Sequence, residues 1–224
     1  MSVTLVVETS SPSYGAAVSR SGELLAHETV RRGGPAFHSV GHLVASCLET
    51  AGMRFADLDS LAVDCGPGNL NSVRAGVAYV NGLAFSLGKP VFAAGSLEVL
   101  AVQAAAEAPH LPVLCVRRTQ GGVVFAGLYP AGFTGPVAGD HPPVLRTGPL
   151  AETVSALVSG VTEFTVAGPC RGELKELLPD RRVHDSGVEF PSVLALHQLL
   201  AARGARAVFA PFAVPRTDLS TPSS

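Results

Sequence analysis

The sequence of 224 residues has no tryptophan, few aromatic residues (6%) and few charged residues (15%). Charged residues make up roughly 25% of typical globular proteins, so the low share argues against a disordered chain and indicates that a partner covers part of the surface. Neither sign of charge dominates, with 16 Lys and Arg against 18 Asp and Glu. Proteins that bind nucleic-acid phosphates normally have a surplus of basic residues. Any RNA contact is therefore expected to depend on a partner.

Long hydrophobic runs are also absent. The first residues include no basic segment, and Glu8 interrupts the apolar run that follows them, which argues against a signal peptide. The longest uncharged stretch, from Thr119 to Gly139, is broken repeatedly by glycine and proline. It cannot form one continuous spanning helix. We therefore expect a cytoplasmic protein without a membrane segment.

Cysteine is scarce, and its four positions form no C-x-x-C pair: Cys47, Cys65, Cys115 and Cys170. Such spacing is typical of buried, reduced thiols in a cytosolic protein. No metal site or catalytic thiol is predicted from them.

Hydrophobic patterning predicts an α/β protein of one large domain or two small lobes. In the first half, β-branched runs indicate strands, and apolar residues at helical spacing indicate helices. The expected strands are 3–7, 14–19, 23–30, 61–63 and 90–93, and the expected helices are 38–51, 70–87 and one that Ser96 caps.

The second half repeats this order of elements, which predicts a structural duplication without sequence repetition. The expected strands are 112–116, 122–129, 144–145 and 164–166, and the expected helices are 150–158, 172–178 and 192–203. The chain then divides into a first lobe (1–106) with a partner interface, a second lobe (107–216) and a flexible tail (217–224).

Four segments together resemble the TsaB family, also called YeaZ. The resemblance covers the first half of the chain and is much weaker beyond it. The segments are Val6 to Ser10 (VVETS), Cys65 to Gly76 (CGPGNLNSVRAG), Gly82 to Phe85 (GLAF) and Gly95 to Glu98 (GSLE).

The resemblance implies a two-lobed actin-like, Hsp70-like and sugar-kinase (ribonuclease H-like) fold, with a mixed sheet and helices in each lobe. It also implies a non-catalytic scaffold that binds and activates a TsaD-type threonylcarbamoyltransferase during N6-threonylcarbamoyladenosine modification of tRNA beside the anticodon. A TsaE-type ATPase is the other implied partner, and a homodimer is implied in isolation. ATP and a metal ion would belong to the partner subunits, and tRNA would be reached through the complex.

The same resemblance implies a pseudo-enzyme without catalytic residues. The catalytic TsaD-type relative has a metal-binding H-x-x-x-H at the place where this sequence has Ser96 and Leu100. A hydroxyl and an isobutyl group cannot replace two imidazole ligands, so no metal site is expected there.

The second lobe departs from the family pattern. A strand that resembles D-A-R-x-x-E-V-Y in the family is replaced here by the segment from Arg117 to Phe125, which has no acidic residue and no tyrosine. A C-terminal Tyr-x-Arg survives only as Arg216.

A strand-to-helix turn with the sequence Gly-Pro-Gly offers backbone N–H groups to an anion. One interpretation is a remnant nucleotide-phosphate site facing the end of the first strand. The other is a tight turn without a ligand, because no Walker-type lysine follows it. The alternative function is therefore a small-molecule kinase or ATPase of the same fold. The candidate nucleotide-binding residues are Glu8, Thr9, Ser10, Gly66, Pro67, Gly68 and Asn69.

The helix expected over 70–87 is apolar on both sides, and residues 75–88 include no charge. Either the second lobe or another subunit must cover its outer side. His38 and His42 have the spacing of a zinc half-site, but no third ligand is evident, which weakens a metallopeptidase hypothesis. The resemblance favours a subunit interface made by the first two helices. Its predicted residues are His38, His42, Ser46, Arg74, Ala75, Ala78, Tyr79, Gly82 and Phe85.

Overall fold

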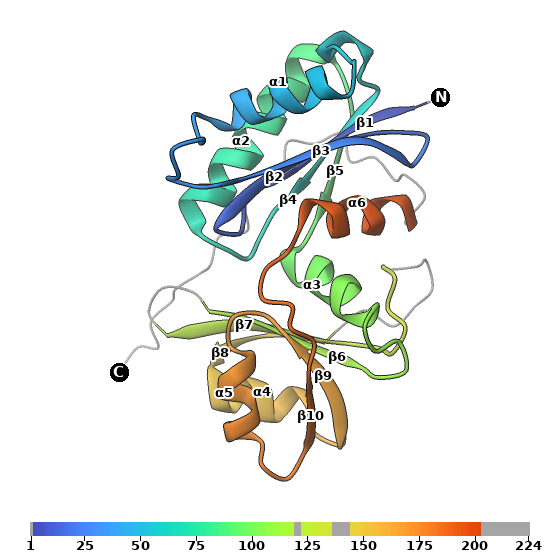
Figure 1. Ribbon diagram of the computed structural model, residues 1–224. Helices are drawn as coiled ribbons and strands as arrows, with labels where there is room; N and C mark the ends of the chain where they lie inside the picture. Colours follow the sequence, from blue (N-terminus) through green and yellow to red (C-terminus); the bar gives the residue numbers. More distant parts are fainter. Residues whose placement is uncertain (1, 119–121, 136–143, 203–224) are drawn as a thin grey trace.

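The computed structural model describes residues 2–118, 122–135 and 144–202 of the chain. Within these residues the chain forms two five-stranded mixed sheets, and helices alternate along the chain with the later strands of each sheet (Figure 1). No helix in these ranges is both long enough and apolar enough to cross a membrane. The four cysteines, all in the described part, form no disulfide.

The first sheet has the strand order β3-β2-β1-β4-β5. Strands β1, β2 and β3 form an antiparallel meander, and β4 and β5 continue the sheet in parallel with β1. The parallel pairing places the carboxyl ends of β1 and β4 side by side, since Val7 pairs with Val63. The strands are β1 (Val3–Glu8), β2 (Ser13–Arg20), β3 (Glu23–Arg31), β4 (Ser60–Asp64) and β5 (Val91–Ala94).

The second sheet repeats this topology, with the order β8-β7-β6-β9-β10. Three antiparallel strands are again extended by two parallel ones. The duplication predicted from the sequence is therefore confirmed. The strands are β6 (Val113–Arg118), β7 (Val123–Tyr129), β8 (Val144–Pro149), β9 (Glu163–Ala167) and β10 (Arg182–Asp185).

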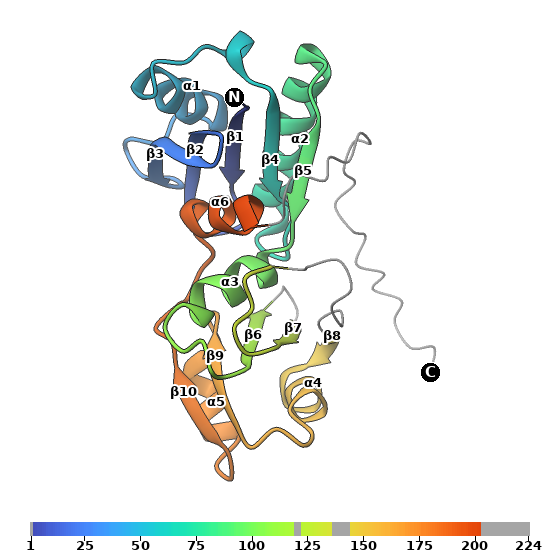
Figure 2. The same cartoon turned by 90° about the vertical axis from the view of Figure 1, so that its right-hand side faces the viewer.

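Helices cover both faces of each sheet. The outer face of the first sheet packs against α1 (Val40–Thr50) and α2 (Leu70–Leu87), and that of the second against α4 (Leu150–Leu157) and α5 (Arg171–Leu177). Between the sheets lie α3 (Ser96–Ala105) and α6 (Val193–Ala202), as Figures 1 and 2 show. Alternate residues of the strands face the two layers: Leu5 packs in the core under α1 and α2, and Val6 packs with α6.

Helix α6 returns to the first lobe, although the predicted division assigns its residues to the second. It contacts β1, β2, β3 and β5 as well as α3. The proposed boundary at residues 106/107 remains a prediction. The predicted tail, 217–224, and Arg216 lie outside the described residues.

The ends of α1 and α2 have local sequence causes. Ser39 caps α1, with its Oγ accepting a hydrogen bond from the His42 N–H at 3.0 Å. Asn69 caps α2 in the same way, and Gly88 ends it in the left-handed conformation at φ 64°. Ser96, predicted as a cap, is instead the first residue of α3, because Gly95 occupies the cap position.

Replacing either of two glycines on α2 by alanine is expected to change stability in opposite directions. A Cβ on Gly76 would lie 2.1 Å from Thr9 Oγ1, whereas a Cβ on Gly82 would meet no atom within 4 Å. Gly76→Ala is therefore expected to destabilise the protein by at least about 2 kcal/mol through overpacking. Gly82→Ala is expected to stabilise it by about 0.5–1 kcal/mol, because alanine favours the helix. Urea denaturation measures both, and equal effects would contradict this packing of α2.

Candidate functional site

A buried polar cluster lies where the two lobes meet, at the carboxyl ends of β1 and β4. Strand β1 ends at Glu8 and β4 ends at Asp64, and both carboxyl groups are buried, at 1% and 0% exposure. Ser96, at the start of α3, donates to Asp64 Oδ1 at 2.6 Å. The cluster thus joins elements that are far apart in the sequence.

Ser10 is the centre of this cluster. Its Oγ lies 2.7 Å from Glu8 Oε1 and 2.9 Å from Asp64 Oδ2, and it also contacts Ser96 Oγ at 3.0 Å. The neighbouring Thr9 points the other way, and its Oγ1 donates to Ser72 O on α2 at 2.9 Å. The segment after β1 therefore makes hydrogen bonds both within the cluster and to the first turn of α2.

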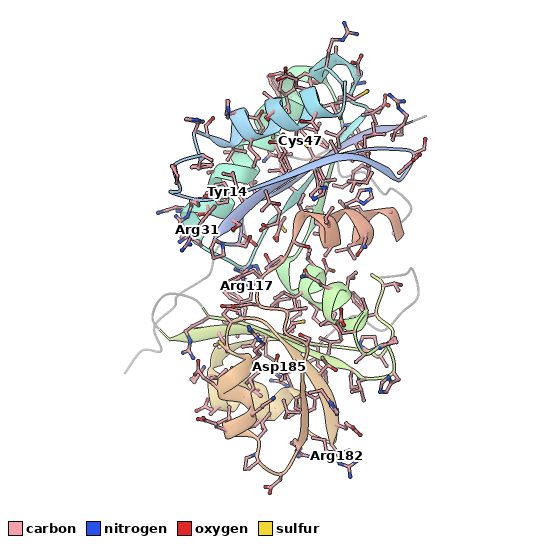
Figure 3. All side chains as sticks on the ribbon, in the orientation of Figure 1. Tyr14, Arg31, Cys47, Arg117, Arg182 and Asp185 are labelled. Carbon is pink, nitrogen blue, oxygen red and sulfur yellow. The ribbon has the colours of Figure 1, made fainter. Side chains whose placement is uncertain are left out.

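Arg117 brings the second lobe into the cluster. It lies on β6 with 5% exposure, and its guanidinium donates to Ser10 Oγ at 2.9 Å and to Ser10 O at 3.0 Å. The Phe190 ring centroid is 6.0 Å from the guanidinium carbon. Figure 3 shows Arg117 between the two lobes. These hydrogen bonds are buried links between the first and second sheets.

The charges of the cluster balance only when one carboxyl group is protonated, because two carboxyl groups face one guanidinium. Burial and the nearby Asp64 raise the pKa of Glu8 from 4.5 to about 7. Burial also raises the pKa of Asp64, whereas Ser96 and the charge of Arg117 oppose that rise. Burial lowers the pKa of Arg117.

Hydrogen bonds from the neighbouring serines oppose this rise. Ser11 Oγ donates to Glu8 Oε2 at 2.5 Å and also contacts the carbonyl oxygen of Ser13 at 2.7 Å. Ser10 donates to Glu8 Oε1 from both its Oγ and its backbone N–H. With these contacts the pKa of Glu8 still lies at about 7, so Glu8 keeps its proton in the folded protein below that pH.

This assignment predicts how stability depends on pH. Between pH 4.5 and about 7, the folded protein retains a proton on Glu8 that the unfolded chain releases. The free energy of unfolding is therefore expected to fall as pH rises through this window and to level off above it. A shift of this size corresponds to about 3 kcal/mol. Urea denaturation at several pH values across this range measures the free energy of unfolding. The Glu8→Gln variant should show no fall in that free energy with pH. An equal fall in Glu8→Gln and in the unaltered protein would contradict a protonated Glu8.

The Gly-Pro-Gly turn packs directly against the cluster. Gly66 donates its N–H to Asp64 Oδ1 at 2.7 Å. A Cβ on Gly68 would lie 2.6 Å from Ser10 O, so glycine is required for this close approach. Pro67 lies between the two glycines, and the Asn69 N–H donates to Ser10 O at 3.4 Å. The structure thus brings together all seven predicted nucleotide-binding residues and pairs several of their polar groups with each other; nucleotide binding itself remains a prediction.

The outer face of α2 is the second candidate site. Its predicted residues Arg74, Ala75, Ala78 and Gly82 are exposed, and the Phe85 side chain is 91% exposed. Tyr79 is half-buried at the contact with α1, where a Cβ on Gly41 would lie 3.4 Å from its ring. The described part of the second lobe does not cover this face, since α2 packs on α1 and the first sheet. The subunit-interface interpretation is thereby favoured over the alternative of cover by the second lobe.

The predicted residues of α1 lie beside this face. His38 and His42 are exposed, and their ring centroids are 4.9 Å apart in an edge-to-face arrangement. Together with Ser46 they line a hollow of about 250 Å³, where Ser46 Oγ donates to Glu28 Oε1 at 2.8 Å. Across the described ranges, no three His, Cys, Asp or Glu side chains are placed to share a metal ion.

Ser96 and Leu100 are both buried on α3. Ser96 binds Asp64, as described above, and Leu100 packs in the hydrophobic core between α3 and the second sheet. Neither position presents a nitrogen ligand.

Sequence reasoning missed Asp64 and Arg117 as members of the cluster. Asp64 could have been predicted from the sequence, because an acidic residue at the end of a buried strand, close to the Gly-Pro-Gly turn, needs a polar or charged partner. Arg117 had none, because Arg117 and Arg118 are adjacent and the sequence does not show which of them points inward. The structure places Arg117 inside and leaves Arg118 41% exposed.

The duplicated topology defines the class: a two-lobed α/β protein with a mixed sheet and helices in each lobe, as predicted. Two solved structures are similar to almost the whole chain. A protein with similarity to peptidase YeaZ from Pseudomonas aeruginosa is 26% identical, with a TM-score of 0.76, and the match covers 96% of this chain and 98% of that one. YeaZ from Pseudomonas aeruginosa is also 26% identical, with a TM-score of 0.71, and 91% and 94% are covered. The predicted resemblance to the TsaB (YeaZ) family is therefore confirmed.

Comparisons of sequence find similarity to tRNA N6-adenosine threonylcarbamoyltransferases. The family model TsaD: tRNA N6-adenosine threonylcarbamoyltransferase matches residues 38–126. The tRNA N6-adenosine threonylcarbamoyltransferase of Moorella thermoacetica is 47% identical over 49 residues, and that of Clostridium perfringens is 38% identical over 60 residues. These matches span 22% and 27% of this chain but only 14% and 18% of the relatives.

Proposed function

We propose that this protein is a non-catalytic subunit of the tRNA N6-threonylcarbamoyladenosine modification system, which binds and activates a TsaD-type threonylcarbamoyltransferase. The observation that carries the proposal is the exposed face of α1 and α2, within a chain that is similar to YeaZ over nearly its whole length. The match of residues 38–126 to the TsaD model includes both helices.

The chemistry of this face suits a partner helix. Its small residues Ala75, Ala78 and Gly82 let another backbone approach closely, and Phe85 offers a large apolar side chain for a pocket on the partner. An apolar patch of this kind on a soluble domain indicates a protein–protein contact.

Activation would work by a shift of population. A subunit that binds one conformation of its partner more tightly raises the fraction of that conformation. Docking of α1 and α2 would favour the competent arrangement of the TsaD-type subunit. In this proposal the chain holds no cofactor, ATP and the metal ion belong to the TsaD-type and TsaE-type subunits, and tRNA is reached through the complex in the cytoplasm. In isolation the same face would form a homodimer.

The proposed role is tested by reconstituting tRNA modification from the TsaD-type and TsaE-type proteins of the same organism, with and without this chain. Both reactions are supplied with tRNA, ATP and threonylcarbamoyl adenylate, whose threonylcarbamoyl group is transferred to the tRNA with release of AMP. We expect threonylcarbamoyladenosine to accumulate only when this chain is present, and the chain alone to hydrolyse no ATP. Modification at the same rate without the chain would refute the activator role, and ATP turnover by the isolated chain would favour the kinase or ATPase alternative.

A further inference from the structure

A cavity of about 450 Å³ lies on the other side of the first sheet from α1 and α2. Its walls come from the turn after β1, from the end of β3 and from the segment that leads into α6. This volume lies within the range of small-molecule sites, roughly 300–1,000 Å³. The cavity is separate from the proposed partner face, so an inference about it does not depend on the proposed function.

The wall formed by the segment before α6 is apolar and aromatic. Phe190 and Pro191 line it, with Pro12 from the turn after β1 opposite. The guanidinium carbon of Arg117 lies 6.0 Å from the centroid of the Phe190 ring. An aromatic wall favours a flat, apolar group in a ligand.

Arg31 places a positive charge at the cavity. Arg31, on the last position of β3, lines it with an exposed side chain, and no acidic side chain of the described residues forms an ion pair with it. Figure 3 shows Arg31 at the lower left edge of the first lobe and Arg117 between the two lobes. Glu8 is the acidic residue of the lining, but it is only 1% exposed and its carboxyl group accepts hydrogen bonds from Ser10 and Ser11 within the buried cluster. The hydroxyls of Thr29 and Ser192 supply further donors to the cavity.

We propose that this cavity binds a small organic anion, with its carboxylate, phosphate or sulfonate group paired to Arg31 and its flat apolar part against Phe190. Arginine suits this role because its planar guanidinium matches two oxygens of such a group at once.

Benzenesulfonate is the test probe, because its charge is fixed at all accessible pH values. Isothermal titration calorimetry should show saturable binding with a Kd of about 1 mM, a reasonable value for ten non-hydrogen atoms. Methanesulfonate tests the anion alone and benzyl alcohol tests the ring alone, and both are expected to bind at least about tenfold more weakly, a loss of about 1.4 kcal/mol.

The Arg31→Met variant tests whether benzenesulfonate binds in this cavity and not elsewhere on the protein. It is expected to weaken benzenesulfonate binding at least about tenfold, because an aliphatic chain replaces the guanidinium. The matched control is Arg32→Met, since Arg32 is the next exposed arginine and does not line the cavity. Thermal denaturation confirms that both variants are folded. No saturable binding by the unaltered protein, equal binding by Arg31→Met, or equal binding of methanesulfonate would each overturn the proposal.

Discussion

Arg117→Met is expected to lower the free energy of unfolding by about 3–5 kcal/mol, the loss that follows when one member of a buried charged cluster is removed. The guanidinium donates two hydrogen bonds to Ser10 and is the cation of the cluster that faces Asp64 and Glu8. Methionine keeps the volume and the packing against Phe190 but leaves Asp64 buried without a neighbouring positive charge. Urea denaturation measures the change.

The neighbouring arginine is the matched control. Arg118 is on the same strand, is 41% exposed and pairs with Glu173 at 2.6 Å. Arg118→Met should cost less than about 1 kcal/mol, since exposed ion pairs contribute little. In a double-mutant cycle, Asp64→Asn should recover part of the loss in Arg117→Met, because it removes the unpaired anion. Equal costs for the two arginine variants would show that Arg117 does not join the lobes electrostatically.

Ala78→Arg and Gly82→Arg are each expected to abolish binding to the TsaD-type partner, weakening it at least about 100-fold. Either arginine places a long charged side chain in a face of small residues, where a partner helix would have to bury it. The fold should be retained, because Ala78 is exposed and a Cβ on Gly82 meets no atom within 4 Å.

Co-purification with the tagged partner measures this loss, and thermal denaturation verifies folding. Leu145→Arg is the control, since Leu145 is 60% exposed on β8 in the other lobe and its change should leave the complex intact. Phe85→Ala should weaken binding by a smaller factor, as it removes an anchor without adding a charge. Retention of the complex by both arginine variants would show that the partner docks elsewhere.

Much of the fold follows from local signals in the sequence. The bounds of α2 are as predicted, because Asn69 caps its start and Gly88 ends it. The duplication was visible because buried strands and amphipathic helices alternate in the same order in both halves. Strand β10 was missed because three of its four residues are exposed, so it has no apolar run to reveal it.

What the sequence could not predict depends on contacts between distant segments. Arg117 and Ser10 are 107 residues apart, and only the packing of the two sheets brings them together. The placement of α6 on the first sheet also depends on contacts between distant segments. Its apolar residues could pack on either sheet, so the sequence alone does not show which sheet it covers. The sequence shows that the outer side of α2 has small and apolar residues. Whether the second lobe covers that side could be known only from the position of the second lobe in the structure.

The most direct test of the central claim is the light-scattering mass of this chain mixed with the TsaD-type protein of the same organism. The account predicts a new species whose mass equals one copy of each protein, and its loss when Gly82→Arg replaces the unaltered chain. A mixture that shows only the masses of the two separate proteins would contradict a scaffold that acts through α1 and α2.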